Sequence, residues 1–252
     1  MPPAGHVGDG TPAAGLTTRS SRTVARHVQL RLHGLVIALA AAMVVLVVTT
    51  AASAASVSPY PDAIGRVEFD GGNCTGVLIA PRKVLTAAHC LYTEDGRRAP
   101  GDVRFAAGRV YGQAAAVGRV AQIVVPAGYA YNPAPETAEA LVADIALLRL
   151  DGDLGVQPLR LARSEITGAF DAIGYAAPLQ EQPRKQYACT VADRAMPDGV
   201  IATTCSGIPG ASGGPLIDGG DPPMVLGIVV ANNRRAGIAL TAVHIRRLLD
   251  LR

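Results

Sequence analysis

Residues 210–215 read GASGGP, a serine surrounded by residues with little or no side chain. Glycine permits backbone angles that other residues avoid and lets a ligand approach the main chain closely. In such a loop Ser212 can expose its hydroxyl group beside backbone N–H groups that stabilise a developing oxyanion, which acyl transfer requires. The string alone is also typical of turns and linkers, so this chemistry depends on a base and an acid elsewhere in the chain.

The candidate base is His89. Beyond residue 54 the chain holds two histidines, His89 and His244, and His244 is expected at the surface of a C-terminal helix. His89 follows an apolar segment, VLTAAHC at residues 84–90, and a disulfide at its neighbour Cys90 would fix the imidazole. A general base must be positioned before its pKa matters, so this setting favours a catalytic histidine.

The candidate acid is Asp144, which opens the apolar run DIALLRL at residues 144–150. An aspartate at the start of a strand is commonly a turn residue. A buried carboxylate at this point could instead accept a hydrogen bond from the imidazole of His89. That bond holds the correct tautomer and stabilises the imidazolium that forms during nucleophilic attack.

The N-terminal part has the pattern of an export signal. Residues 35–48 (LVIALAAAMVVLVV) form an unbroken apolar run, preceded by four arginines and followed by Ala-Ser-Ala at residues 52–54. This pattern predicts a secretory signal peptide that is cleaved near residue 54. If it is not cleaved, residues 35–55 are long enough to anchor the protein in a membrane. We therefore expect a secreted protein, with a membrane-anchored one as the alternative.

The net positive charge of the chain lies in this export segment. Of the 23 basic and 20 acidic residues, four arginines and one aspartate lie in residues 1–54, which leaves 19 of each beyond that point. The remainder is neutral, and no basic patch in it indicates a nucleic acid partner.

All four cysteines lie beyond the export segment. An even number of cysteines in an exported chain favours disulfides, and we expect the pairs Cys74–Cys90 and Cys189–Cys205, which close loops of similar length. A zinc site with His89 among its ligands is the alternative, although the cysteines form no C-x-x-C pair. We expect no metal and no cofactor.

Short apolar segments separated by turn signals follow from Ile64 onward, which predicts an all-β sandwich or barrel. The segments include residues 76–80, 83–88, 103–107, 121–126, 144–150, 186–191, 200–205, 215–218 and 225–231. Residues 151–165 lack alternation and divide the strands into two groups, which predicts two small antiparallel barrels.

The expected domain organisation follows from these boundaries. It comprises an N-terminal extension with the export signal at residues 1–54, a first β-barrel at 55–150, a linker at 151–165 and a second β-barrel at 166–252. A short C-terminal helix is expected within residues 242–252, where Val243, Leu248 and Leu251 lie near one face.

Three motifs in this order resemble the trypsin/chymotrypsin-like serine peptidase family: LTAAHC at residues 85–90, DIALLRL at 144–150 and GASGGPL at 210–216. The resemblance covers residues 64–252. It implies two six-stranded antiparallel β-barrels with the active site in the cleft between them.

The resemblance also implies the role of each candidate residue. His89 is the general base and acid, Asp144 its orienting partner and Ser212 the nucleophile, while the N–H groups of Gly210 and Ser212 form the oxyanion hole. The pair Cys74–Cys90 matches the family's histidine-loop bridge, whereas Cys189–Cys205 has no equally secure counterpart in the family.

Two positions depart from the family pattern. Animal digestive members have an aspartate before the nucleophile that pairs with a newly freed N-terminal amine, but here that position is Ala211, and no basic residue precedes Ile64. We expect an active site that forms on folding, as in secreted bacterial members such as the glutamyl-endopeptidase-like group. Val230 replaces the serine that usually bonds the catalytic aspartate, so a backbone N–H would have to substitute.

Substrate preference depends on fewer residues. By motif offset, Ser206 lies at the base of the S1 pocket, Gly237 leaves room on one wall and Asn232 narrows the entrance. The absence of an acidic residue at position 206 disfavours cleavage after Arg or Lys. Glutamate-specific relatives use a histidine where this chain has Val229, so small or medium uncharged P1 side chains are expected.

These observations predict a secreted serine endopeptidase that hydrolyses protein or peptide substrates through an acyl-enzyme intermediate. The alternatives are a catalytically inactive binding module with the same double barrel, and a protease that stays anchored in a membrane.

Overall fold

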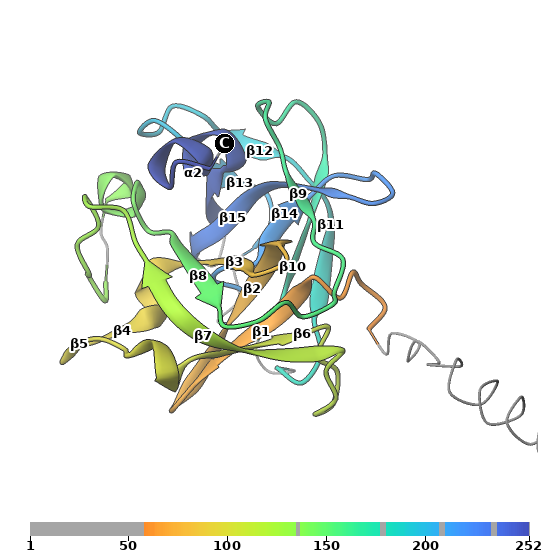
Figure 1. Cartoon of the computed structure of the whole chain (residues 1–252). Helices are drawn as coiled ribbons and strands as arrows, with labels where there is room; N and C mark the ends of the chain where they lie inside the picture. Colours follow the sequence, from red (N-terminus) through yellow and green to blue (C-terminus); the bar gives the residue numbers. More distant parts are fainter. Residues whose placement is uncertain (1–57, 135–136, 177–179, 207–209, 233–235, 252) are drawn as a thin grey trace, which may run out of the picture. The chain divides into compact units, whose positions relative to one another are not determined.

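The computed structural model describes residues 58–134, 137–176, 180–206, 210–232 and 236–251 (Figure 1). The expected export signal and its cleavage site lie outside these ranges. None of the helices in the described ranges is both long enough and apolar enough to cross a membrane.

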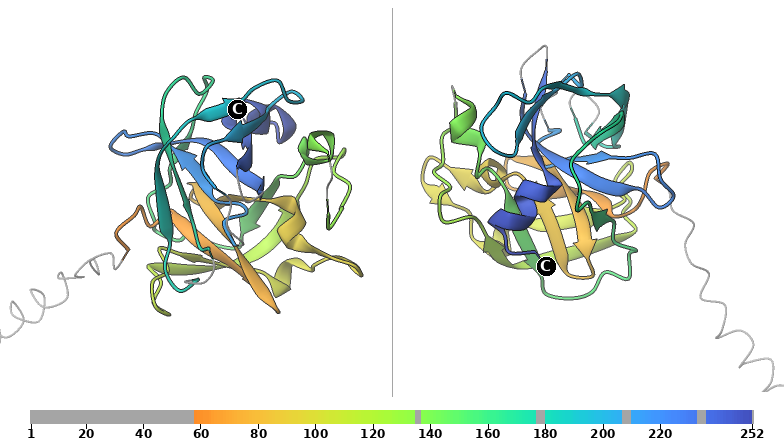
Figure 2. Two further views of the ribbon diagram at one scale, coloured as in Figure 1. Left: turned by 180° about the vertical axis from the view of Figure 1, so that it is seen from behind. Right: turned by 90° about the horizontal axis from the view of Figure 1, so that it is seen from above.

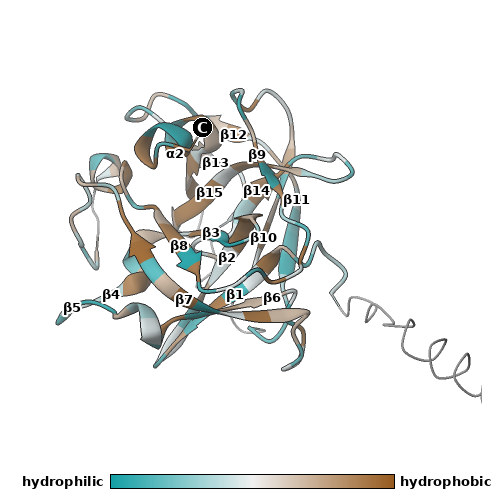
Figure 3. Ribbon diagram, in the orientation of Figure 1, coloured by the Kyte–Doolittle hydropathy of each residue, from teal (hydrophilic) through white to brown (hydrophobic). Residues whose placement is uncertain are grey.

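Six antiparallel strands close into the first barrel, in the order β1-β2-β3-β8-β7-β6. Alternation places apolar side chains on the inner face, and Figure 3 shows apolar and hydrophilic residues alternating along β7. An Asp70-Gly71 turn joins the first two strands, and Gly71 has a positive φ (79°), which glycine adopts readily. The strands are β1 (Ile64–Phe69), β2 (Gly72–Ala80), β3 (Lys83–Thr86), β6 (Arg104–Ala107), β7 (Ala116–Val124) and β8 (Ala146–Leu150).

A second sheet with a curled shape contains the C-terminal strands, in the order β11-β10-β14-β15-β16-β13-β12. Its neighbouring strands are antiparallel, except that the short β9 pairs in parallel with β15. The strands are β9 (Arg160–Leu161), β10 (Phe170–Gly174), β11 (Arg184–Cys189), β12 (Val191–Asp193), β13 (Val200–Thr203), β14 (Pro215–Ile217), β15 (Met224–Asn232) and β16 (Gly237–Thr241).

The two edges of this second sheet are continuous in the chain. β11 and β12 stand at opposite ends of the strand order, yet only Thr190 separates them. Two hydrogen bonds between Thr190 and Thr204 (2.8 and 2.9 Å) and the disulfide Cys189–Cys205 tie this segment to the chain after β13. The chain backbone therefore completes a ring that the hydrogen-bond ladder leaves open.

Short elements complete the fold. The hairpin of β4 (Tyr92–Thr93) and β5 (Gly96–Arg97) follows the 3₁₀ turn η1 (Ala88–Leu91). Two further 3₁₀ turns are η2 (Pro100–Asp102) and η3 (Ala138–Leu141), and η3 precedes β8.

The predicted fold class is confirmed: the protein is mostly β, with a closed six-stranded barrel, a curled second sheet and one C-terminal helix. The second sheet differs from the expected closed barrel because β11 and β12 are joined by the chain and not by a ladder. The segment expected as a plain linker, residues 151–165, contributes β9. A two-residue parallel strand has too little alternation to be recognised in a sequence.

The main apolar core extends through both sheets. One contiguous cluster contains Phe105 and Leu148 of the first barrel together with Ile228 of β15 and Ile245 of the C-terminal helix. A smaller cluster around Phe170 and Leu216 lies within the second sheet alone. Because the two halves share one apolar core, their relative position is fixed by the same packing that stabilises the fold.

The C-terminal helix α2 (Ala242–Leu248) packs against β15 and β16 (Figure 2). Thr241 caps it by accepting a hydrogen bond from the N–H of His244 (3.4 Å). The helix buries Ala242, His244 and Ile245, whereas Val243, expected on the packed face, is only partly buried.

The prediction of a surface position for His244 is wrong. The side chain is buried, and its Nε2 lies 2.9 Å from the carbonyl oxygen of Val142, in the segment between η3 and β8. The helix therefore holds the chain of the first half through a polar contact, which spacing along the helix does not reveal.

We predict that replacing Cys189 and Cys205 together by alanine lowers the free energy of unfolding by about 3 kcal/mol. The bridge spans 16 residues, and its removal returns the freedom of that loop to the unfolded chain. Urea denaturation of the variant and the parent under non-reducing conditions measures the difference. An unchanged midpoint with an unchanged slope would contradict the prediction.

Candidate active site

The turn that carries His89 is fixed by a disulfide. β3 ends at Thr86, and His89 lies in the 3₁₀ turn η1 that follows. Its neighbour Cys90 is bridged to Cys74 on β2, with 6.3 Å between the Cα atoms. The imidazole stays partly accessible, with 31% of the side chain exposed, so a substrate can reach it.

Asp144 is buried, and both of its carboxylate oxygens bond to His89. Nδ1 of His89 lies 2.7 Å from Oδ2, and the backbone N–H of His89 donates to Oδ1 (2.8 Å). Because the carboxylate only accepts, the ring proton resides on Nδ1 and Nε2 carries a lone pair. The backbone N–H of His89 is thus a main-chain donor to the aspartate carboxylate.

Aromatic side chains lie beside this pair. The ring centroids of Tyr92 are 5.3 Å from Tyr129 and 5.5 Å from Tyr131. Burial, and next the negative charge of Asp144, raise the pKa of Tyr129 far above its usual range. The phenol is therefore neutral at neutral pH.

The loop that carries Ser212 depends on two glycines with positive φ. Gly210 has φ 92° and Gly213 has φ 81°, and a Cβ atom at either position would overlap backbone atoms of a neighbouring segment. The N–H of Gly214 donates to the carbonyl of Ala211 (2.8 Å), which closes the turn around the serine. Only residues without a side chain fit at these two points.

Hydrogen bonds place this loop against both halves of the protein. The N–H of Gly213 donates to the carbonyl of Val229 on β15 (2.7 Å), and the carbonyl of Ser212 accepts from the N–H of Thr75 on β2 (2.9 Å). Thr75 follows Cys74, which is bridged to the neighbour of His89. Ser212 and His89 are therefore connected through one short stretch of β2.

The serine loop leaves two donors open. Within the part of the chain that the structure describes, no protein acceptor bonds the N–H of Gly210 or of Ser212, the two groups assigned to the oxyanion hole. In the same ranges, no hydrogen bond joins Ser212 Oγ to His89 Nε2. Such bonds often tighten only when a substrate is bound.

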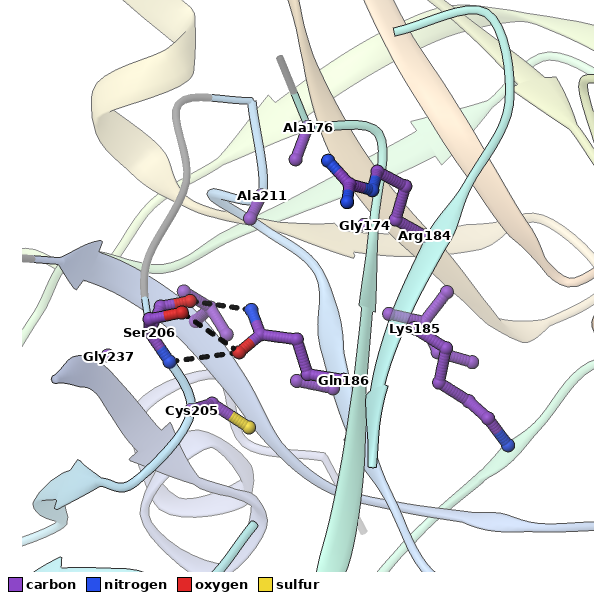
Figure 4. A pocket seen from close by; sticks show the side chains of 12 residues that line it. Gly174, Ala176, Arg184, Lys185, Gln186, Cys205, Ser206, Ala211 and Gly237 are labelled. Carbon is purple, nitrogen blue, oxygen red and sulfur yellow. Dashed lines mark hydrogen bonds between the residues drawn. The ribbon is translucent and has the colours of Figure 1, made fainter. Parts of the chain in front are cut away.

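The pocket next to the serine loop contains two of the three predicted substrate-binding residues. Ser206 and Gly237 line it together with Val229 and Ala211, as Figure 4 shows for the labelled residues. Asn232 does not line it and lies exposed at the end of β15. A Cβ atom at Gly237 would lie 3.0 Å from the carbonyl oxygen of Cys205, so the glycine permits close backbone packing there.

Gln186 lines this pocket beside Ser206, the residue expected at its base. Its Oε1 accepts from the N–H (2.9 Å) and the hydroxyl (3.2 Å) of Ser206, and its Nε2 donates to the Ser206 carbonyl (2.5 Å). Figure 4 shows these three contacts. The floor is thus polar but uncharged.

Cationic side chains lie on one side of the pocket. Arg184 and Lys185 are among the lining residues, and the Lys185 ammonium forms an ion pair with Asp171 (2.9 Å) outside it. Figure 4 shows that Lys185 points away from Gln186. Among the lining residues that the structure describes there is no aspartate or glutamate.

Gln186 and Thr75 are residues that the sequence did not single out. Each acts on a segment more than fifteen residues away in the chain, and no local motif surrounds either one. The zinc alternative is not supported, because Cys74 and Cys90 lie near His89 but their sulfurs are bonded to each other and offer no thiolate.

We predict that Gly213→Ala destabilises the protein by more than 2 kcal/mol, because a side chain here is strained by the positive φ and overlaps the Thr75 carbonyl and the Thr86 hydroxyl. Gly219→Ala is the matched control, since nothing lies within 4 Å of its Cβ position. Thermal unfolding of both variants measures the effect, and equal melting temperatures would contradict the assigned loop geometry.

Comparisons with known proteins agree with this arrangement. Residues 74–228 match the family of the trypsin-like peptidase domain. A search of curated proteins finds no significant match.

Two solved structures share the fold. A Glu endopeptidase in complex with MPD has 21% identity and a TM-score of 0.60 over 77% of this chain and 91% of that one. The thermostable serine protease AL20 from an extremophilic microorganism has 20% identity and a TM-score of 0.58 over 74% of this chain and 94% of that one. With the family match over more than half of its length, the chain belongs to the trypsin-like peptidase family and is a serine-type endopeptidase.

Proposed function

We propose that the protein is a secreted serine endopeptidase in which Ser212, His89 and Asp144 form the catalytic triad. The observation that carries this assignment is the pairing of both Asp144 oxygens with His89, which holds the proton of the neutral imidazole on Nδ1 and leaves Nε2 as its acceptor. A base in that state can accept the proton of a serine hydroxyl.

The reaction follows from these roles. Ser212 Oγ attacks the scissile carbonyl carbon while its proton passes to His89 Nε2, and the imidazolium is stabilised by Asp144. The N–H groups of Gly210 and Ser212 bind the oxyanion of the tetrahedral intermediate. His89 then protonates the leaving amine, and water, activated by the same imidazole, releases the acyl group from Ser212.

The oxyanion hole is proposed to form on folding, without a freed N-terminal amine. Ala211 cannot pair with an amine, and Ile64 is buried in β1 with its N–H donated to the carbonyl of Pro61 (2.9 Å). These contacts support an active site that does not depend on cleavage before Ile64.

The proposal includes export and a division into domains. Two disulfides are compatible with an oxidising compartment. We place the export signal in residues 1–54, the first barrel in 55–150, the linker in 151–165 and the second barrel in 166–252. N-terminal sequencing of the protein from the culture medium separates cleavage near residue 54 from retention of residues 35–55 as a membrane anchor.

We predict that a fluorophosphonate probe labels the purified protein and that Ser212→Ala abolishes labelling, because the probe reacts only with an activated serine. Ser164→Ala, a change at an exposed serine outside the site, is the control and should label like the parent. Gel fluorescence measures the adducts. Absence of Ser212-dependent labelling in folded protein would favour the alternative, a catalytically inactive binding module.

We predict faster cleavage after small or medium uncharged residues than after Arg or Lys. The pocket has a neutral floor at Ser206 and Gln186 and a cationic side chain, Arg184, on its wall. A cationic P1 side chain would be repelled there without a carboxylate to neutralise it. Initial rates across a fluorogenic peptide library test this order.

Two other outcomes are informative. Preference for Arg or Lys would show that this pocket does not receive the P1 side chain. Preference for Glu, the residue in the name of one structural neighbour, a Glu endopeptidase, would contradict the prediction of an uncharged P1 side chain. Loss of that preference in the Arg184→Gln variant would show that Arg184 on the pocket wall causes it.

A further inference from the structure

Thr75 contacts both residues that flank Ala211 in the serine loop. Its backbone N–H donates to the carbonyl of Ser212 (2.9 Å), and its hydroxyl lies 2.8 Å from the carbonyl oxygen of Gly210. The residue is fully buried on β2 of the first barrel. A single residue of one half thus holds two carbonyl groups of the loop in the other half, one on each side of Ala211.

The direction of the hydroxyl bond is determined by a second partner. The N–H of Tyr175 lies 2.8 Å from Thr75 Oγ1 and can only donate. The hydroxyl must therefore use its own hydrogen for the Gly210 carbonyl. The carbonyl of Thr75 accepts in turn from the hydroxyl of Thr86 (2.7 Å), so the N–H, the carbonyl and the hydroxyl of Thr75 are all hydrogen-bonded.

The loop lacks the support that a charged side chain at position 211 would supply. Ala211 presents only a methyl group, which packs near Gly174. A Cβ atom added at Gly174 would lie 3.0 Å from the Ala211 Cα atom and 3.2 Å from its Cβ atom. Among the described residues, the Thr75 hydroxyl is the side-chain group that bonds the backbone of residues 210–212. Gly210, a glycine with φ 92°, has little intrinsic preference that would otherwise hold its carbonyl in place.

We propose that the Thr75 hydroxyl is a positioning group that orients the oxyanion-hole N–H groups of Gly210 and Ser212 from the neighbouring barrel. It does not touch the substrate. It fixes the peptide group between Gly210 and Ala211, which lies between the two peptide groups that carry these N–H groups, and so limits the rotation of both before the oxyanion forms. This inference rests on the proposed function, because it concerns the same oxyanion hole.

Steady-state kinetics of Thr75→Val tests the proposal, since valine keeps the shape but removes the hydroxyl. We expect kcat to fall about 10- to 100-fold, with KM changed less than about threefold, because donors that are misaligned lose stabilisation of the transition state more than binding of the ground state. Thr75→Ser, which restores the hydroxyl, should recover kcat to within a few-fold of the parent.

Thr241→Val is the matched control for the loss of a buried threonine hydroxyl. Thr241 caps α2 and contacts no residue of the serine loop among the bonds described. Its replacement should lower the melting temperature and leave kcat unchanged. A general loss of stability would reduce both variants alike, so only a selective fall in kcat for Thr75→Val supports a positioning role.

If Thr75→Val does not fold, Thr75→Ala and Thr75→Ser replace it, because the two share the loss of the methyl group and differ only in the hydroxyl. A peptide boronic acid, which mimics the tetrahedral intermediate, should bind the alanine variant at least tenfold more weakly than the serine variant. A product peptide should bind both equally.

The outcomes separate the two proposals. A parent protein without Ser212-dependent labelling would overturn the proposed function and this inference with it. A labelled, active parent whose Thr75→Val variant keeps its kcat, or whose alanine and serine variants bind the boronic acid equally, would overturn the inference alone.

Discussion

The buried interface between the two halves is the constraint on which the active site depends. His89 and Asp144 belong to the first barrel and Ser212 to the loop before β14, so no single half contains all three proposed catalytic residues. The apolar core that extends from the first barrel into β15 and α2 holds the halves together. The polar contacts across this interface then set the orientation of individual groups.

Those polar contacts run in both directions. Thr75 of the first barrel holds the serine loop of the second half, and His244 of the C-terminal helix bonds the carbonyl of Val142, two residues before Asp144. Each half therefore bonds a backbone carbonyl group of the other. Buried hydrogen bonds are suited to this task because an unpaired carbonyl in the interior costs about 1 to 3 kcal/mol, which disfavours any displaced arrangement.

A third link between the halves is ionic and more exposed. Glu68 lies among Arg66, Arg104 and Arg109, and the first and last of these also reach Glu181 in the second half. The guanidinium of Arg109, with that of Arg66, holds the pKa of Glu181 below its usual range. Glu181 is exposed and its charge is screened by solvent, so its ion pairs contribute little to the stability of the fold.

Local patterns were sufficient for much of this protein. Alternating apolar segments predicted most of the strands, the cysteine spacing predicted both bridges, and the motifs around His89, Asp144 and Ser212 indicated the chemistry. Only the tertiary structure determined the contacts between these segments. They are the hydrogen bond to the Gly210 carbonyl, the buried contact of His244 and the hydrogen bonds of Gln186 with Ser206. The sequence GASGGP indicates that the glycines of this loop can adopt unusual backbone angles, but which angles they adopt depends on contacts with β2. Hydrogen bonds between residues about a hundred positions apart leave no periodicity in a sequence, because they depend on how two barrels meet and not on neighbouring residues.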